Sequence, residues 1–293
     1  MYHGIVNQRM VPVRKSFGSK SERVDELLYG MPVWIKEETN MEWIKVESFY
    51  HYTGYIRRRE LIYNLDENSW EKRMKKVVIK NFADVLEKPK ISSPVLMTLL
   101  KGAVVRWEGG EEGWSKIVTW EGEKGYMRSE YLSKSPFFGD LYFQKNAAGI
   151  LRSDKEETFR NNLVKTAYSY LGVPYRWGGK TAMGIDCSGL CSMVYLLNGV
   201  VIYRDAKRKE GFPIKKIPPK QMKRGDLLYF KGHIAMYTGD GRYIHSTAKM
   251  GSGGVVLNSL KKESREYRED LAKGILEVGS LFPAGYEEES RSL

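Results

Sequence analysis

The first half of the chain alternates apolar and polar residues in short runs. The alternation is clear in VWIKEE and WIKVES, and again in VVRWEG and WSKIVTW. A period of two is typical of strands with one buried face. Gly, Asn and charged clusters separate the runs and mark turns. Short strands with frequent turns predict small β-barrels or sandwiches in this half.

The same half contains an internal repeat. Three motifs recur in order at an offset of 71 or 72 residues: LLYG at 27–30 and LLKG at 99–102, Trp43 and Trp114, and GYIR at 54–57 and GYMR at 125–128. A fixed period indicates two copies of one structural unit. We therefore expect two small all-β domains, residues 1–70 and 71–135.

The second half changes to helical spacing and then to strands. Leu163, Ala167 and Tyr170 lie at helical spacing and predict a helix that ends near Gly172. A second helix is expected at 187–197, followed by the strands DLLYF, HIAMYTG, RYIHST and GVVLNSL. Helices followed by antiparallel strands predict an α+β domain, residues 154–293, after a linker at 136–153.

Composition and charge narrow the function classes. The 293 residues suit two or three domains, and 42% apolar with 29% charged residues is ordinary for a globular protein. The net charge of +12 can attract anionic polymers, but the basic residues are scattered, so a solubilising surface explains them equally well. We expect no nucleic-acid partner and no membrane span. The N-terminus lacks an export-signal pattern, so we expect a cytoplasmic protein, or an exported one if the N-terminus was trimmed.

Cys187 is a candidate nucleophile. It and Cys191 are four residues apart, which excludes a disulfide framework, and two cysteines with four histidines leave little for a zinc site. We expect neither a metal nor an organic cofactor. Cys187 begins the second predicted helix, where unpaired N–H groups and the helix dipole should lower the thiol pKa. A lone cysteine is more often a small buried side chain, which is how we interpret Cys191.

Two histidines can complete a catalytic set. His233 opens one predicted strand, and His245 lies on the next, after the turn sequence TGDGR. Such a hairpin should bring the two rings together. A nucleophile, a base beside it and a group that orients the base form the pattern of covalent catalysis. The alternative is that each histidine only caps a strand or fills a polar gap.

The motifs DCSGL and GDLLYFKGHIAMYTGDGRYIHST, preceded by YLGVPYRWGGK, resemble the NlpC-type bacterial cell-wall cysteine peptidases, a branch of the papain-like group. This resemblance covers about residues 155–282. Residues 8–64 and 75–135 resemble bacterial SH3-like domains. The resemblance implies an α+β papain-like catalytic domain preceded by two small all-β SH3-like barrels. The combination resembles peptidases that cleave γ-D-glutamyl–diamino-acid bonds.

The resemblance also implies roles for individual residues. Cys187 would be the nucleophile, His233 its general base and later the acid for the leaving amine, and His245 the residue that orients His233. The backbone N–H of Cys187 would stabilise the oxyanion.

Substrate contacts follow from the same resemblance. Asp186 would bind the free amine of an N-terminal L-alanine through a charge-assisted hydrogen bond, although it can also be a helix N-cap. Ser188 flanks the nucleophile, and Trp177 matches a pocket wall. Asp205 matches a segment in which Ser commonly follows Asp. Here Ala206 stands in that place, which removes a hydroxyl contact.

In relatives of this kind, an acid and a tyrosine of the first SH3-like domain close the pocket around the substrate's N-terminus. Glu22 and Tyr55 are the matches, and Glu26 competes with Glu22. The alternatives are surface charge for the acid and barrel packing for the tyrosine.

Three functions are therefore compared. The first is an endopeptidase that cleaves the γ-D-glutamyl–diamino-acid bond, with diaminopimelate or lysine, in stem peptides with a free N-terminal L-Ala. The second is an endopeptidase or amidase acting on intact peptidoglycan. The third is a non-catalytic wall-binding protein. The Cys and His set argues against the third, and a pocket closed at its far end favours the first.

Overall fold

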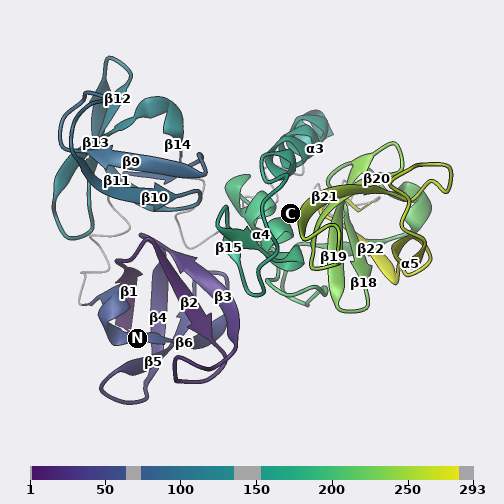
Figure 1. Ribbon diagram of the computed structural model, residues 1–293, viewed down its shortest axis with the longest axis horizontal. Helices are drawn as coiled ribbons and strands as arrows, with labels where there is room; N and C mark the ends of the chain where they lie inside the picture. The colour runs from purple at the N-terminus through teal and green to yellow at the C-terminus, as the bar shows by residue number, and fades with distance from the viewer. Residues whose placement is uncertain (1, 64–73, 135–152, 284–293) are drawn as a thin grey trace, which may run out of the picture. The chain divides into compact units, whose positions relative to one another are not determined.

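The structure, a computed structural model, describes residues 2–63, 74–134 and 153–283 (Figure 1). The chain divides into two compact units, residues 1–138 and 139–293. The first unit is built from strands, and the second combines helices with a sheet. The predicted linker at 136–153 lies outside the described residues except for Ser153, which begins a helix.

The first unit consists of two sheets of seven strands. The first sheet contains β1 (Tyr2–Val6), β2 (Met10–Arg14), β3 (Arg23–Leu28), β4 (Pro32–Glu38), β5 (Trp43–Ser48), β6 (Thr53–Arg57) and β7 (Leu61–Ile62). The second contains β8 (Lys75–Val78), β9 (Phe82–Leu86), β10 (Val95–Leu100), β11 (Val104–Glu111), β12 (Trp114–Val118), β13 (Lys124–Arg128) and β14 (Leu132–Lys134). The 3-10 turns η1 (Arg58–Glu60) and η2 (Ser129–Tyr131) precede the last strand of each.

The strand orders confirm the sequence repeat. The first sheet runs β3-β2-β6-β5-β4-β1-β7, and the second runs β10-β9-β13-β12-β11-β8-β14. Adding seven to each number of the first order gives the second. The buried positions also repeat, since Leu27 and Ile56 correspond to Leu99 and Met127, and all four are at most 1% exposed. Two copies of one small β-unit therefore form the first unit.

The two β-units are joined by hydrogen bonds around Tyr29, in the turn after β3. Its hydroxyl donates to Oε2 of Glu121 over 2.7 Å and accepts from the backbone N–H of Trp120 over 2.8 Å. The backbone N–H of Val104 donates to the Tyr29 carbonyl over 2.8 Å. The repeat is broken at this point because Lys101 occupies the position that corresponds to Tyr29. The two copies therefore have different roles at their contact.

The second unit is an α+β domain, as predicted. Its elements are α3 (Ser153–Tyr168), β15 (Lys180–Thr181), β16 (Gly184–Ile185), α4 (Cys187–Leu197), β17 (Lys215–Ile217), η3 (Pro219–Gln221), β18 (Leu227–Phe230), β19 (His233–Gly239), β20 (Arg242–Thr247), β21 (Gly254–Ser259), α5 (Glu269–Ala272) and β22 (Glu277–Ser280). The antiparallel sheet has the order β17-β22-β18-β19-β20-β21.

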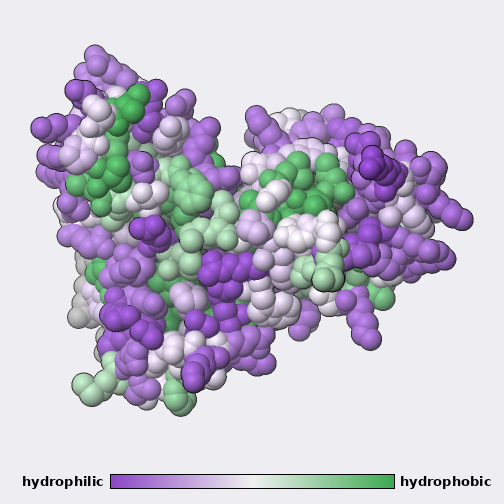
Figure 2. Space-filling view, viewed as in Figure 1, coloured by the Kyte–Doolittle hydropathy of each residue, from purple (hydrophilic) through white to green (hydrophobic). Residues whose placement is uncertain are grey.

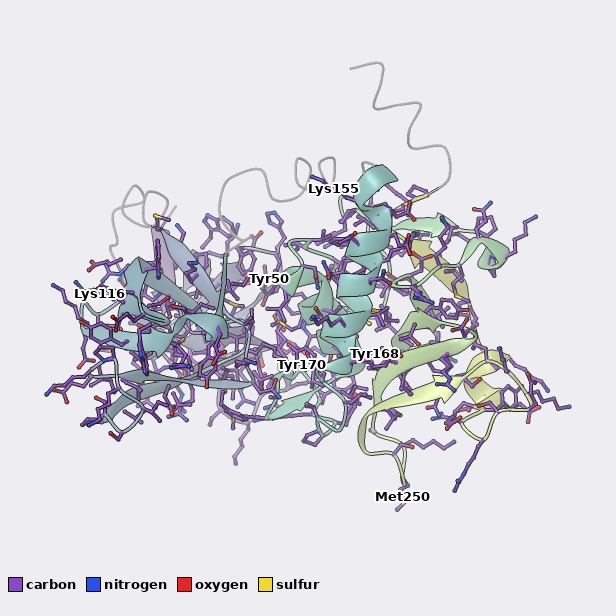
Figure 3. The ribbon with its side chains drawn as sticks, turned by 90° about the horizontal axis from the view of Figure 1, so that it is seen from above. Tyr50, Lys116, Lys155, Tyr168, Tyr170 and Met250 are labelled. Atoms are coloured by element: carbon purple, nitrogen blue, oxygen red, sulfur yellow. The ribbon has the colours of Figure 1, made fainter. Side chains whose placement is uncertain are left out.

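The helix α4 is the central element of this unit. Its first ten residues, 187–196, are all buried, which is typical of a helix that is apolar on every side. It packs against β19 and α3. The helix α3 ends earlier than predicted, at Tyr168, and the chain then turns so that Tyr170 enters the core while Tyr168 stays 38% exposed (Figure 3). The short turn after α3 thus separates two tyrosines with different environments.

A buried ion pair fastens α3 to the sheet. Nη1 of Arg160 lies 2.7 Å from Oδ1 of Asp226, just before β18, and Ser280 of β22 donates to the same oxygen over 2.6 Å. Polar side chains make up most of the visible face of both units, with smaller apolar groups between them (Figure 2). The Arg160–Asp226 pair, in contrast, is buried inside the second unit. Its charged groups form hydrogen bonds within the protein.

Candidate active site

Cys187 is the first residue of α4, and Asp186 caps that helix. The Asp186 backbone is extended, with φ −89° and ψ 178°, and its side chain accepts a hydrogen bond from the N–H of Gly189. Cys187 is 7% exposed. The backbone N–H groups of Ile234 and Ser188 donate toward its sulfur. Since Ile234 follows His233, the thiol lies beside the start of β19.

Burial, and then the neighbouring Asp186 carboxylate, raise the pKa of the Cys187 thiol to about 11. The N–H of Ile234 and the guanidinium of Arg204 act in the opposite direction. The prediction that the helix start lowers this pKa is therefore wrong. Taking a thiolate out of water costs more than the two N–H donors and the guanidinium of Arg204 return.

His233 and His245 are brought together as the hairpin predicted. They lie on one face of β19 and β20 at diagonal positions, because Met236 pairs with Ile244 and Tyr237 with Tyr243. Nε2 of His233 is 2.8 Å from Nδ1 of His245. The rings are nearly perpendicular, with an interplanar angle of 78°.

A third residue, Asn258 of β21, extends this pair into a chain of hydrogen bonds. Nδ2 of Asn258 donates to the carbonyl of Glu266 over 2.9 Å, which leaves its Oδ1 as the acceptor for Nε2–H of His245, 2.8 Å away. A neutral His245 then accepts at Nδ1 from Nε2–H of His233. Nδ1 of His233 is consequently an unprotonated acceptor. Asn258 was not among the predicted site residues, because its only signal in the sequence is a polar residue at the end of the apolar run Val255–Leu257.

Burial lowers the pKa of both histidines to about 4. For His233 the neighbouring His245 contributes next, and for His245 the bond to Asn258 acts in the opposite direction. At neutral pH the thiol and both imidazoles are therefore uncharged. An imidazole in this state can accept a proton, which is what a general base requires.

The carboxylate of Asp186 is held by Arg204, which the sequence analysis did not single out. Nη1 and Nη2 of Arg204 lie 3.1 and 3.0 Å from Oδ1 and Oδ2 of Asp186, and Nη1 also donates to Oγ of Ser188 over 2.7 Å. Arg204 is 1% exposed. The buried guanidinium of Arg204 compensates the negative charge of Asp186, which would otherwise lie unpaired beside the thiol.

Both oxygens of Asp186 are engaged within the protein. Oδ1 accepts from Gly189, Ser188 and Arg204, and Oδ2 accepts from Gly178 and Arg204. The N-cap interpretation of Asp186 is confirmed. Its binding of a substrate ammonium stays a prediction, as does a substrate contact by Ser188, whose hydroxyl is used in the same network.

The remaining predicted contacts of the second unit lie near the start of α4 in sequence or on the loop that follows it. Trp177 is 60% exposed. Asp205 accepts a hydrogen bond from Tyr203, whose pKa rises to about 12 mainly through burial. A residue that the sequence analysis missed is Tyr175: burial, and then the neighbouring Cys187, raise its pKa to about 12. Its hydroxyl is therefore a further candidate for the substrate site.

The residues of the first unit that were predicted to contact the substrate lie in different environments. Glu22 is paired with Lys15 over 3.3 Å, and its side chain is 42% exposed. Glu26 is fully buried and lies 3.5 Å from Nη1 of Arg23. Tyr55 of β6 makes an edge contact with the ring of Phe17. A role for Glu22, Glu26 or Tyr55 in substrate binding stays a prediction.

Within residues 2–63, 74–134 and 153–283, no group of three or more His, Cys, Asp or Glu side chains is placed to hold a metal ion. In the same part of the chain, no helix has the length and apolar character needed to cross a membrane.

An α+β domain with a cysteine at a helix start, next to a strand that opens with a paired histidine, defines a papain-like cysteine hydrolase. The model of the NlpC/P60 family matches residues 172–270, and the model of the bacterial SH3 domain matches residues 81–133. A protein named Dipeptidyl-peptidase 6 from Lysinibacillus sphaericus is 44% identical over 267 residues, which cover 89% of this chain and 93% of that protein. The chain belongs to the NlpC/P60 family, and it is a cysteine peptidase.

Two further comparisons concern more distant proteins. A protein from Bacillus cereus named Gamma-D-glutamyl-L-lysine dipeptidyl-peptidase is 26% identical over 242 residues, which cover 78% of this chain and 62% of that protein. A crystal structure of an NlpC/P60 family protein from Bacillus cereus superposes with a TM-score of 0.74 at 17% identity, covering 96% of this chain and all of that one. The similarity to this crystal structure supports the fold alone.

Proposed function

We propose that this protein hydrolyses the amide bond between γ-linked D-glutamate and a diamino acid, diaminopimelate or lysine, in peptidoglycan stem peptides. The observation that supports the chemistry best is the hydrogen-bond chain from Asn258 through His245 to His233, beside the buried Cys187. The substrate class is supported by the name of the relative from Bacillus cereus, a γ-D-glutamyl-L-lysine dipeptidyl-peptidase.

In the first step, the Cys187 thiol gives its proton to Nδ1 of His233 while the sulfur attacks the carbonyl carbon of the γ-glutamyl group. The reaction starts from a neutral thiol and a neutral imidazole because burial raises the pKa of the one and lowers that of the other. His245 and Asn258 keep the unprotonated nitrogen of His233 available. The backbone N–H of Cys187 is the proposed donor to the oxyanion.

In the second step, the protonated His233 donates to the nitrogen of the leaving diamino acid, and the C–N bond breaks to leave a thioester on Cys187. Water then attacks the thioester, losing a proton to His233. Transfer of that proton to the sulfur regenerates the thiol and releases the γ-glutamyl peptide. No step consumes a group other than water and the substrate.

We propose stem peptides with a free N-terminal L-Ala as the substrates, in preference to intact peptidoglycan. Asp186 would interact with the terminal ammonium, as the family resemblance implies. Released peptides of this kind are substrates for a cytoplasmic enzyme, and the compartment stays a prediction. Action on intact peptidoglycan is the competing function.

The test is cleavage of L-Ala-γ-D-Glu-diaminopimelate against the same peptide with an acetylated amine, followed by mass spectrometry. Cleavage of the free peptide alone is expected. Equal cleavage of both would reject recognition of the free amine and favour the wall-degrading function. Cleavage of neither, together with no release from purified peptidoglycan, would reject the peptidase proposal for these substrates.

The chemistry is tested by Cys187→Ala, with Cys191→Ala as the matched control. Both cysteines are buried on α4, four residues apart. The first substitution should abolish turnover while the protein stays folded, and the second should leave turnover measurable. Hydrolysis by the Cys187→Ala variant would reject the thiol mechanism.

A further inference from the structure

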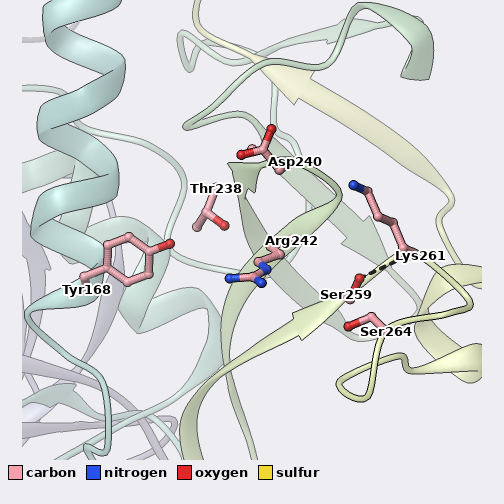
Figure 4. A pocket seen from close by; sticks show the side chains of 8 residues that line it. Tyr168, Thr238, Asp240, Arg242, Ser259, Lys261 and Ser264 are labelled. Carbon is pink, nitrogen blue, oxygen red and sulfur yellow. Dashed lines mark hydrogen bonds between the residues drawn. The ribbon is translucent and has the colours of Figure 1, made fainter.

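The second unit contains a polar pocket that the proposed reaction does not use. Its volume is about 360 Å³, and it is lined mainly by Tyr168, Thr238, Asp240, Arg242, Lys261 and Ser264 (Figure 4). A volume of this size suits a small ligand. The lining comes from the end of α3, the turn between β19 and β20, and the chain that follows β21.

The pocket is separate from the thiol and its histidines. His233 begins β19, whereas Thr238 lies five residues later at the other end of the same strand. At a rise of roughly 3.3 Å per residue, this places Thr238 about 17 Å along the strand from His233. Arg242 is the first residue of β20, on the far side of the turn. The pocket therefore lies at the tip of the hairpin whose opposite end holds the histidine pair.

One buried hydroxyl in the pocket has no hydrogen-bond partner among the described residues. Thr238 is 8% exposed, and its Oγ1 is buried and has no hydrogen bond within the described protein. The hydroxyl of Tyr168 points toward Thr238 and the guanidinium of Arg242 (Figure 4). A buried hydroxyl left without a partner costs free energy that a bound acceptor would return. Ser259, in contrast, accepts from the N–H of Lys261 over 3.0 Å and is already satisfied.

The charges favour one anionic group. Arg242 and Lys261 are positive and Asp240 is negative, which gives the lining a net charge of +1. Next to the lining, the Arg224 side chain packs over Gly239, and Glu266, which accepts from Ser264 over 2.8 Å, lies near Arg242 and Arg265, so the surroundings remain positive. A monoanion complements this balance, whereas a phosphate dianion would meet the carboxylate of Asp240.

We propose that this pocket binds the carboxylate of a small ligand, such as a short peptide or acid. The guanidinium of Arg242 provides the fork that matches carboxylate geometry, and the hydroxyls of Tyr168 and Thr238 donate to the same group. Lys261 supplies the second positive charge. The pocket is a binding site and takes no part in hydrolysis, so this proposal does not depend on the proposed function.

The test is a titration of the isotopically labelled full chain, followed by NMR, with N-acetylglycine, N-acetylglycinamide and inorganic phosphate. N-acetylglycine should shift the backbone amide signals of residues 238–242, and the uncharged amide should not. Equal shifts with the amide would overturn the role of charge. Phosphate binding about tenfold tighter than N-acetylglycine would overturn the preference for a monoanion.

Variants assign the binding to the pocket. Arg242→Met should weaken N-acetylglycine binding by about tenfold or more, because a charge-assisted hydrogen bond is lost. Lys262→Met, at the exposed neighbour of Lys261 that lies outside the lining, should leave it unchanged. Thr238→Val keeps the shape of the side chain and removes the buried hydroxyl, so it tests the site if Arg242→Met fails to fold. Undiminished binding in a folded Arg242→Met variant or in Thr238→Val would overturn the proposal.

Discussion

Nη2 of Arg204 lies 3.0 Å from Oδ2 of Asp186, and both side chains are buried. Asp186 precedes Cys187 and caps α4, so the guanidinium holds the start of the helix that presents the thiol. It also offsets the carboxylate, which by itself raises the pKa of Cys187. Arg204 thus affects both the position of the nucleophile and the charge around it.

Arg204→Met should destabilise the protein and lower kcat/KM. The substitution leaves the Asp186 carboxylate buried without its cation, which typically costs about 3–5 kcal/mol. Arg204→Lys keeps the charge without the fork and should give intermediate losses. Urea unfolding and steady-state kinetics measure the two effects, with the exposed Lys220→Met as control. A stable, fully active Arg204→Met variant would show that the ion pair is dispensable.

Asn258→Ala should lower kcat/KM by about tenfold, because His245 loses the acceptor that fixes its tautomer. Asn258→Asp places a negative charge 2.8 Å from the ring and should raise the pKa of His245, which moves the acid limb of the pH–rate profile upward. If Asn258 had only a structural role, its substitution would change the free energy of unfolding and leave the pH–rate profile unchanged. Gln221→Ala, at an exposed amide in the same unit, is the control.

Folding stability should decrease as the pH falls from about 6.5 to about 4. The pKa of His233 and of His245 falls from 6.5 to about 4 on folding, so the unfolded chain binds more protons in this interval. The free energy of unfolding therefore rises with pH there and is independent of these two groups above it. Urea unfolding of the wild type and of a His233→Gln/His245→Gln variant measures this contribution. The same dependence in both proteins would contradict it.

Gly30→Ala should destabilise the first unit more than Gly18→Ala. Both glycines have a positive φ, +77° and +116°, which costs an alanine about 1–2 kcal/mol. A Cβ at Gly30 would also overlap the carbonyl oxygen of Val104, whereas nothing lies within 4 Å at Gly18. The difference in unfolding free energy between the two variants measures the close contact of the two β-units. Equal losses of unfolding free energy in the two variants would mean that the two β-units can move apart at this contact with little cost.

The sequence by itself determined the local elements and their order. The repeat at 71 or 72 residues predicted two copies of one β-unit, and the two sheets have the same strand order. The start of α4 at Cys187 and the hairpin between β19 and β20 were also predicted. These features depend on neighbouring residues and on short periods, which a sequence displays directly.

The tertiary structure decided what the chemical groups experience. The pKa of Cys187 is raised mainly by burial, which depends on the packing around the thiol. The partners of Asp186 and His245 are Arg204 and Asn258, which lie 18 and 13 residues further along, on other segments of the chain. Packing brings such residues together, and desolvation then sets their charge. Contacts between such distant residues and the burial of their charges exist only in the folded chain.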